Sequence, residues 1–168
     1  KPRVMSLVLF TCAVGLLISP SSVSFSFASL SLLAFAMGSG AAGALNMWYE
    51  SDLDALMSRT CLRPIPTGKI KKNQALYFGI ALSTFASMIL YYSSNLLSSV
   101  LLVFTIGFYF FVYTIWLKRK TPQNIVIGGA AGALPPIIGW AIAMNNISLE
   151  PIILFLIIFI WTPSHFWA

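Results

Sequence analysis

Three of the four acidic side chains in this 168-residue chain lie within five positions, at the end of a long apolar run. They are Glu50, Asp52 and Asp54, which follow shortly after Asn46. Asn46, Glu50 and Asp54 recur every four residues, so a helix would align their oxygens along one face and place Asp52 roughly opposite. A carboxylate at mid-bilayer costs roughly 2.5–3.5 kcal/mol on insertion scales, so intramembrane acids usually line a cavity and serve function.

Oxygen ligands in this order are typical of a magnesium site. Mg²⁺ usually takes one or two carboxylates and fills its remaining positions with water and substrate phosphate. We therefore predict that Asn46, Glu50 and Asp54 are metal ligands. The alternative is a charged helix end whose acids pair with Arg59 and Arg63. The spacing alone leaves both interpretations open.

The loop that follows the acids carries basic side chains, among them Arg59, Arg63 and Lys69. Arginine offers a planar fork for two oxygens and lysine a point charge, so these residues could hold a diphosphate. They could instead only fix the orientation of the chain in a membrane. The closeness of acids and bases favours binding, because a magnesium diphosphate needs both.

Composition defines the broad class of the protein. The chain is 58% hydrophobic and 8% charged, whereas ordinary soluble domains are roughly 25% charged. This composition predicts an all-α, polytopic transmembrane helix bundle. Because the first and last apolar runs meet the ends of the chain, we expect one membrane domain over residues 1–168, truncated at both ends. The runs long enough to span, at about 20 residues each, are 4–19, 25–48, 73–93, 96–117, 125–144 and 151–168.

The ten lysine and arginine residues form three clusters between these runs. In an alternating six-span topology all of them fall on one side of the membrane, which the positive-inside rule assigns to the cytoplasm. The acidic cluster then lies at a cytoplasmic mouth. The net charge of +6 is explained by these topology signals, so we expect no nucleic-acid partner. The triplet at 118–120 is on this basis a stop signal at a helix end.

Two stretches of small residues lie inside the spans. Residues 38–43 formally match GxGxxG, but a dinucleotide site needs a strand before this motif and a helix after it. Small residues let helices approach closely in lipid, so we predict a packing role here and at 128–133. The following Pro135 and Pro136 predict a break or kink in the fifth span.

Four strings in the chain resemble a known family. The stretch from Asn46 to Gly68, NMWYESDLDALMSRTCLRPIPTG, closely resembles the first Asp-rich motif of the intramembrane prenyltransferases. Residues 1–3, 113–124 and 161–167 narrow the resemblance to the heme O synthases within that superfamily. The resemblance covers nearly the whole chain, and its motifs are long and specific.

The resemblance implies a bundle of nine membrane helices around a central cavity, of which this chain supplies about six. It implies a Mg²⁺-dependent transfer of a farnesyl group from farnesyl diphosphate to a vinyl group of heme b, giving heme O. The implied partners are farnesyl diphosphate, heme b, the lipid bilayer and other enzymes of heme synthesis. The implied location is a bacterial inner membrane, with the mitochondrial inner membrane as the alternative.

The resemblance also carries roles over to particular residues. The metal-diphosphate motif falls on the residues already predicted as metal ligands, and Arg63 matches a diphosphate contact. Lys118 matches a catalytic basic residue near the leaving group, and Tyr113 is expected to bind substrate. His165 matches a histidine tied to heme handling, although a single histidine near an interface is by itself more often structural.

The chain departs from the family pattern at several positions. Glu50 stands where the motif usually has Asp, Ser51 where Arg is common, and Ser164 where Pro is usual. Glu reaches one methylene further than Asp, so the metal geometry would shift. The second acidic motif is expected after the His165 segment, where the chain stops. We therefore expect this chain alone to be inactive.

Other functions are compatible with parts of the sequence. Prenyl transfer to a quinone precursor or chlorin is one alternative, against which the His165 segment argues. A cation transporter or channel is another, but transporters usually carry ionisable residues deep in several spans. A heme-holding assembly subunit without catalysis is the third.

Overall fold

The computed structural model describes residues 2–118, 120–121 and 123–167, and every regular element in these ranges is helical. One helix, η1, has π-helical hydrogen bonding and continues directly from α5. The helices in chain order are α1 (Pro2–Leu17), α2 (Phe25–Tyr49), α3 (Ser51–Leu56), α4 (Lys72–Ser93), α5 (Leu96–Gly107), η1 (Phe108–Leu117), α6 (Asn124–Ala133), α7 (Pro135–Met144) and α8 (Leu149–Trp167).

Four of the six predicted membrane spans are found where composition predicts them. In the described part of the chain, four helical segments are long and apolar enough to cross a membrane, and two shorter apolar helices lie at the positions of the first and last runs. The protein is therefore an integral membrane protein with an all-helical fold. The four long segments are Phe25–Tyr49, Lys72–Ser93, Leu96–Leu117 and Asn124–Met144, and the shorter helices are Val4–Leu17 and Leu149–His165.

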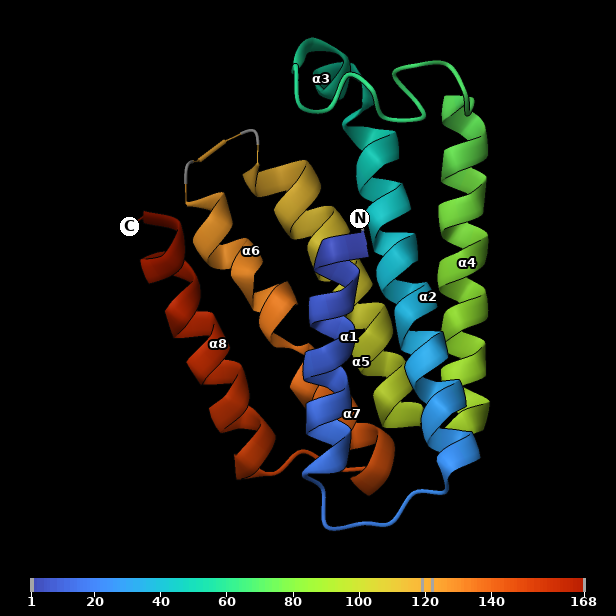
Figure 1. Ribbon diagram of the computed structural model, residues 1–168, viewed down its shortest axis with the longest axis vertical. Coiled ribbons are helices and arrows are strands. Elements are labelled where there is room, and N and C mark those ends of the chain that lie inside the picture. The colour runs from blue at the N-terminus through green and yellow to red at the C-terminus, as the bar shows by residue number, and fades with distance from the viewer. Residues whose placement is uncertain (1, 119, 122, 168) are drawn as a thin grey trace.

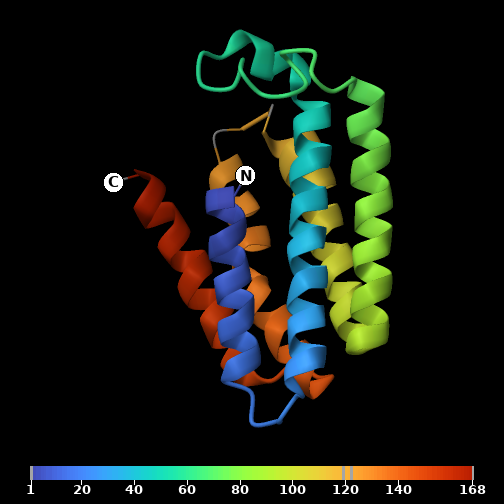
Figure 2. The same cartoon turned by 45° about the vertical axis from the view of Figure 1, so that its right-hand side comes forward.

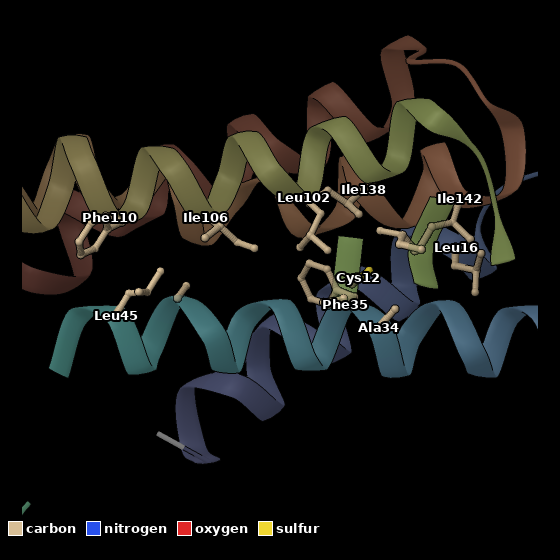
Figure 3. Packing of buried hydrophobic residues seen from close by; sticks show 13 residues of the cluster. Cys12, Leu16, Ala34, Phe35, Leu45, Leu102, Ile106, Phe110, Ile138 and Ile142 are labelled. Atoms are coloured by element: carbon tan, nitrogen blue, oxygen red, sulfur yellow. The ribbon is translucent and has the colours of Figure 1, made fainter. Parts of the chain in front are cut away.

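The helices pair in a pattern that chain order alone does not give. Helix α2 packs along its neighbour α4, whereas α1 packs against α7 from the far end of the chain. Helix α8 packs on α6 and α7 at the outer edge of the bundle, on the side away from α4 (Figures 1 and 2). The core lies where α1, α2, α5 and α7 meet, and Figure 3 shows Phe35, Leu102 and Ile138 converging there.

The contact between α1 and α7 depends on glycine. A Cβ added at Gly139 would lie 1.9 Å from the carbonyl oxygen of Cys12, and one added at Gly15 would lie 2.1 Å from that of Pro136. Both distances are shorter than any real Cβ contact, so the two backbones touch only because these residues have no side chain. This is the close helix approach that small residues permit in lipid.

The two predicted small-residue stretches also pack closely, though not at every position. A Cβ at Gly38 would meet Leu102 of α5 at 2.8 Å, and one at Gly128 would meet Tyr113 of η1 at 2.2 Å. A Cβ added at Gly43 or Gly132 would meet no described atom within 4 Å. The packing interpretation is confirmed for the glycines that face neighbouring helices.

Local signals explain where several helices begin and end. The side chains of Ser24 and Asn95 accept hydrogen bonds from backbone N–H groups in the first turns of α2 and α5, which are N-caps. The predicted break in the fifth span is confirmed, since α6 ends at Ala133 and α7 begins at Pro135. Proline has no backbone N–H to donate and clashes with the preceding turn, so it starts a new helix.

The loops between spans divide by charge. The loop from α3 to α4 and the connection from η1 to α6 lie at the same end of the bundle in both views (Figures 1 and 2). The described lysine and arginine side chains lie in these two connections or, for Lys72, at the first residue of α4, as the six-segment topology predicts. Lys1 and Arg119 of the basic clusters lie outside the described residues.

Candidate active site

The acidic cluster lies where α2 passes into α3 (Figure 1). Glu50 interrupts the helix with φ −90° and ψ 4°, yet its N–H still donates to Asn46 O (3.0 Å) and Asp54 N–H donates to Glu50 O (2.8 Å). The four-residue register therefore continues through the break. Asn46, Glu50 and Asp54 are 1%, 3% and 3% exposed. Their burial on one side agrees with the predicted common face, while their role as metal ligands stays a prediction.

Asp52 lies on the other side, as the helical spacing predicts. Its side chain is 77% exposed and accepts from Lys72 Nζ, whose distances to the two carboxylate oxygens are 3.2 and 3.4 Å. An exposed pair of this kind contributes little stability. Asp52 is therefore a surface residue. In the described part of the chain, none of its hydrogen bonds or ion pairs joins it to the buried acids.

Each buried member of the cluster has a partner from elsewhere in the chain. Lys118 Nζ donates to Glu50 Oε2 at 2.7 Å, and Arg63 Nη1 donates to Asp54 Oδ2 at 2.7 Å. Asn46 Nδ2 donates to Thr114 Oγ1 at 3.2 Å. Ion pairing with Arg63, one part of the alternative to metal binding that the sequence left open, is thus present for Asp54.

These pairs balance the charge of the site. A buried carboxylate without a partner is strongly disfavoured, so the two cations make burial of Glu50 and Asp54 possible. Two carboxylates, one amide and two cations meet at one mouth of the bundle. In the described residues no three His, Cys, Asp or Glu side chains gather, so a metal here would use few protein ligands. That donor set fits Mg²⁺ bound together with substrate phosphate.

The loop after α3 is held over the end of α2 by its own hydrogen bonds (Figure 2). Buried Thr60 donates from Oγ1 to the carbonyl oxygen of Asp54 at 3.0 Å, which turns the chain back toward the site. Gly68 has φ +75°, a left-handed conformation that favours glycine. This fold of the loop places the Arg63 guanidinium against Asp54.

The two remaining partners of the cluster, the Thr114 hydroxyl and the Lys118 cation, come from η1 and its C-cap. In a π-helix each turn is wider than in an α-helix and the backbone bonds run from residue i to i−5. Lys118 N–H accordingly donates to Tyr113 O at 3.0 Å. The Tyr113 ring stacks on Tyr109, with centroids 5.1 Å apart, and Lys118 Nζ lies 5.9 Å from its centre. Tyr113 thus contacts Lys118, which in turn contacts Glu50.

Three of the predicted substrate-binding residues have exposed side chains, unlike the buried acids. Arg59 and Lys69 are exposed on the loop, and the ion pairs of the described residues do not include them. His165 is exposed on α8, where its ring stacks on Trp161 with centroids 4.2 Å apart. The two views place the carboxyl end of α8 away from α3 (Figures 1 and 2).

Two threonines that contact the site were not predicted from the sequence. Thr114 and Thr60 are both buried and bond to Asn46 and to the backbone of Asp54. A hydroxyl four residues before Lys118 in an otherwise apolar run repeats the spacing of Asn46 and Glu50. The spacing alone does not identify Thr114, because its contact with Asn46 forms only when η1 packs against α2.

An apolar groove adjoins the site at the level of the membrane. It has a volume of about 650 Å³ and lies between α4 and the α5–η1 segment. Leu45, which precedes Asn46, and Phe110 of η1 line it, and Phe110 also packs on Tyr49 at 6.3 Å between ring centroids. An apolar chain approaching from the lipid would meet this surface beside the polar cluster.

A membrane bundle of helices with buried acids and paired cations at one mouth defines an intramembrane prenyltransferase-like protein. The chain belongs to the UbiA prenyltransferase family, whose sequence profile matches residues 8–168. Protoheme IX farnesyltransferase from Pelagibacter ubique (strain HTCC1062) is 73% identical over 168 residues, which are 100% of this chain and 55% of that protein. Protoheme IX farnesyltransferase 2 from Mesorhizobium japonicum (strain LMG 29417 / CECT 9101 / MAFF 303099) is 59% identical over the same length, 54% of that protein.

A solved structure supports the fold. A UbiA homolog from Archaeoglobus fulgidus, bound to DMAPP and Mg²⁺, superimposes with a TM-score of 0.74 over 95% of this chain and 59% of its own, at 20% sequence identity. The predicted helical bundle of the intramembrane prenyltransferase type is confirmed by this likeness. The chain spans about half the length of the curated relatives it matches.

Proposed function

We propose that the whole protein transfers a farnesyl group from farnesyl diphosphate to a vinyl group of heme b, giving heme O. The observation that carries the proposal is the buried cluster of Asn46, Glu50 and Asp54 with its two cations, in a chain similar over its full length to protoheme IX farnesyltransferases. The bacterial sources of these relatives also favour a bacterial inner membrane.

The residues of the cluster would hold a Mg²⁺ ion through Asn46 Oδ1 and the carboxylates of Glu50 and Asp54. When bound, that ion would supply positive charge to a departing diphosphate. The fit rests on the donor chemistry, because hard oxygen donors are what Mg²⁺ prefers. The UbiA homolog of similar fold is bound to Mg²⁺, which supports the choice of metal.

The cations of the site provide the remaining electrostatic stabilisation. As the allylic C–O bond breaks, its electron pair leaves with the diphosphate, and Lys118 and Arg63 would stabilise the growing negative charge. Each would exchange part of its contact with Glu50 or Asp54 for a phosphate oxygen. Arg59, Lys69 and Tyr113 are proposed as further substrate contacts at the mouth.

The acceptor half of the reaction needs an apolar environment. The vinyl carbon of heme b attacks the farnesyl cation, and one water then adds its hydroxyl to the vinyl group and releases a proton. Exclusion of other water protects the cation from earlier quenching. We assign His165 to the heme, since imidazole is a common axial ligand of heme iron.

The test is mass spectrometry of heme extracted after expression of the full-length gene with heme b and farnesyl diphosphate available. A heme with the mass of heme O supports the proposal. Unmodified heme with a farnesylated quinone precursor or chlorin would instead assign a different acceptor. Unmodified heme and no prenylated product would favour a transporter or a heme-holding subunit.

The orientation of the site can be tested on native cysteines. Cys12 is buried and Cys61 lies partly exposed in the basic loop. If the loop is cytoplasmic, an impermeant thiol reagent added outside the cell should leave Cys61 unmodified. It should label an Ile147→Cys variant, because Ile147 is exposed at the opposite end. The reverse pattern would place the site outside the cytoplasm.

A further inference from the structure

Three hydrogen bonds join Asp54, Thr60 and Arg63 into a closed ring. The Thr60 hydroxyl donates from Oγ1 to the carbonyl oxygen of Asp54 at 3.0 Å, and Arg63 N–H donates to the carbonyl oxygen of Thr60 at 3.0 Å. The ring closes through side chains, where Arg63 Nη1 donates to Asp54 Oδ2 at 2.7 Å. Thr60 therefore connects the two members of an ion pair, one through its side chain and the other through its backbone.

The end of α3 explains why a hydroxyl is needed at this point. The last four carbonyl groups of a helix have no N–H partner within the helix. Helix α3 ends at Leu56, and Met57 leaves the helical conformation with φ −99° and ψ 125°. The carbonyl of Asp54 is thus one of those that α3 leaves open, and the buried side chain of Thr60 supplies the donor. Without that donor the buried carbonyl would carry the cost of desolvation.

The backbone around Thr60 anchors the loop that follows. The N–H groups of Thr60 and Cys61 both donate to the carbonyl oxygen of Met57, each at 2.9 Å. This turn fixes the carbonyl to which the N–H of Arg63 is bonded. The Arg63 side chain is 26% exposed, against 5% for the side chain of Asp54. The backbone of Arg63 is therefore held in place while its side chain stays partly accessible to a ligand.

We propose that Thr60 is a positioning residue that holds the loop on α3, so that the Arg63 guanidinium is in place to bind a diphosphate. The proposal rests on the proposed function, in which Arg63 exchanges part of its contact with Asp54 for a phosphate oxygen. The two bonds of Thr60 do not involve the guanidinium, so they remain during this exchange and only the arginine side chain moves. If the loop were released, only a fraction of the molecules would present Arg63, and the apparent affinity would fall by that fraction.

The experiment measures binding of a non-reactive farnesyl thiodiphosphate to the purified full-length protein in detergent, by calorimetry with Mg²⁺ present. Thr60→Val keeps the shape and removes the hydroxyl, so the dissociation constant should rise about 10-fold, the effect of one buried hydrogen bond. Thr60→Ser keeps the donor and should stay within about 3-fold of the parent protein. Equal behaviour of the two variants would overturn the proposal.

The same loop offers a matched control. Thr67 Oγ1 donates to the carbonyl oxygen of Arg63 at 2.9 Å, but Thr67 is exposed and does not bond to α3 in the part of the chain that the structure describes. Water can replace its hydroxyl, so Thr67→Val should change the dissociation constant less than about 2-fold. If Thr67→Val weakens binding as much as Thr60→Val, the link to Asp54 is not the cause and the proposal is wrong.

A second background shows whether Thr60 acts through Arg63. Arg63→Gln removes the charge and leaves a donor for Asp54. Adding Thr60→Val to this variant should change the dissociation constant less than about 2-fold, because the side chain that the loop positions is already lost. An equal loss in both backgrounds would overturn the proposal, since Thr60 would then act on the site by another route. Thermal unfolding of each variant checks that it is folded.

Cleavage by trypsin measures the opening of the loop without any ligand. Arg59 and Lys69 are exposed on the loop, and at low protease the cleavage rate tracks the fraction of open molecules. Thr60→Val should be cut about 10-fold faster at these two positions than the parent protein, as mass spectrometry of the fragments can show. Equal rates would show that Thr60 does not hold the loop.

These measurements keep the inference separate from the function it rests on. If Asp54→Asn and Arg63→Gln leave binding of the thiodiphosphate unchanged, the diphosphate site itself is wrongly assigned. If those two variants abolish binding while Thr60→Val changes neither binding nor cleavage, only the role of Thr60 is overturned.

Discussion

The two ends of the helix bundle bury polar groups in different ways. At the end with the candidate site the buried groups are ionic, with Glu50 and Asp54 held against Lys118 and Arg63. At the opposite end the buried polar groups described are neutral, and some of them cap helix ends. Asn95 there caps α5 through Ser98 N–H at 2.9 Å and donates to Ala141 O of α7 at 2.7 Å.

This difference separates structural from functional polarity. An N-cap amide accepts from an N–H in the first turn of a helix, which the helix itself leaves open. A buried ion pair satisfies no such need, and well-packed apolar residues in its place are often as stable or more so. The ionic end is therefore expected to matter for activity, and the neutral end for stability.

The largest expected effect is on activity at the ionic end. Glu50→Gln and Asp54→Asn in the full-length enzyme should each lower the rate of heme farnesylation at least about 100-fold, which is about 2.7 kcal/mol of transition-state stabilisation. Both changes keep shape and remove a charge. Asp52→Asn is the matched control, because it alters an exposed acid of the same segment. If Asp52 proves as critical as Asp54, the one-face interpretation is wrong.

The second prediction concerns the stability of the ionic end. Lys118→Met leaves Glu50 buried without its cation and should lower the free energy of unfolding by about 2–3 kcal/mol, somewhat less than for a fully buried pair because Lys118 is partly exposed. Lys72→Met, which breaks the exposed pair with Asp52, should cost less than about 1 kcal/mol. Thermal unfolding in detergent compares the two variants.

A double variant refines this prediction. Glu50→Met combined with Lys118→Met removes both charges, so most of the lost stability should return. If the double variant is as unstable as Lys118→Met, then packing of the lysine stem and not the orphaned charge explains the loss.

The third prediction concerns the neutral end. Asn95→Ala removes the N-cap of α5 and the bond to Ala141 O, and should cost about 1–2 kcal/mol of stability. Asn95→Ser restores the cap alone and should recover part of the loss. Heme farnesylation per folded molecule should be unchanged in both variants. A drop in turnover without a drop in stability would contradict the separation of the two ends.

The smallest expected effect also lies at the neutral end. Trp140 Nε1 donates to Asn146 Oδ1 at 3.1 Å, close to the exposed loop before α8. Trp140→Phe should lower the free energy of unfolding by less than about 1 kcal/mol through this bond, because Asn146 is exposed and water replaces the lost donor. Thermal unfolding measures the change. A loss above 2 kcal/mol would show that indole packing against the neighbouring helices dominates.

Local features of the fold were predictable because they depend on neighbouring residues. The run at 25–48 corresponds to α2, and the run at 73–93 corresponds to α4. The break at Pro135 was predicted for the same reason, since proline acts on its own turn. The common face of the acids follows from helical spacing, which needs no knowledge of the rest of the chain.

Other features depend on which surfaces meet, and periodicity does not contain that information. Lys118 and Glu50 are 68 positions apart, and nothing local indicates that η1 faces α2. The π-helical bonding of η1 was also missed, because an apolar, aromatic run is compatible with an ordinary helix. Thr114 was overlooked as a result, since its contact with Asn46 exists only after the two helices pack.

The backbone contact between α1 and α7 at Gly15 and Gly139 has a consequence for how the chain enters the membrane. Helices α2 and α4 are neighbours in the chain and in space, so they can associate as soon as both are inserted. Helix α1 cannot do the same, because its partner surface is made much later. At about 5–20 residues per second, the roughly 120 residues between Gly15 and Gly139 take on the order of 10 s to synthesise. During that time the open face of α1 is exposed to lipid or to the insertion machinery, and the bundle closes only when the fifth span arrives.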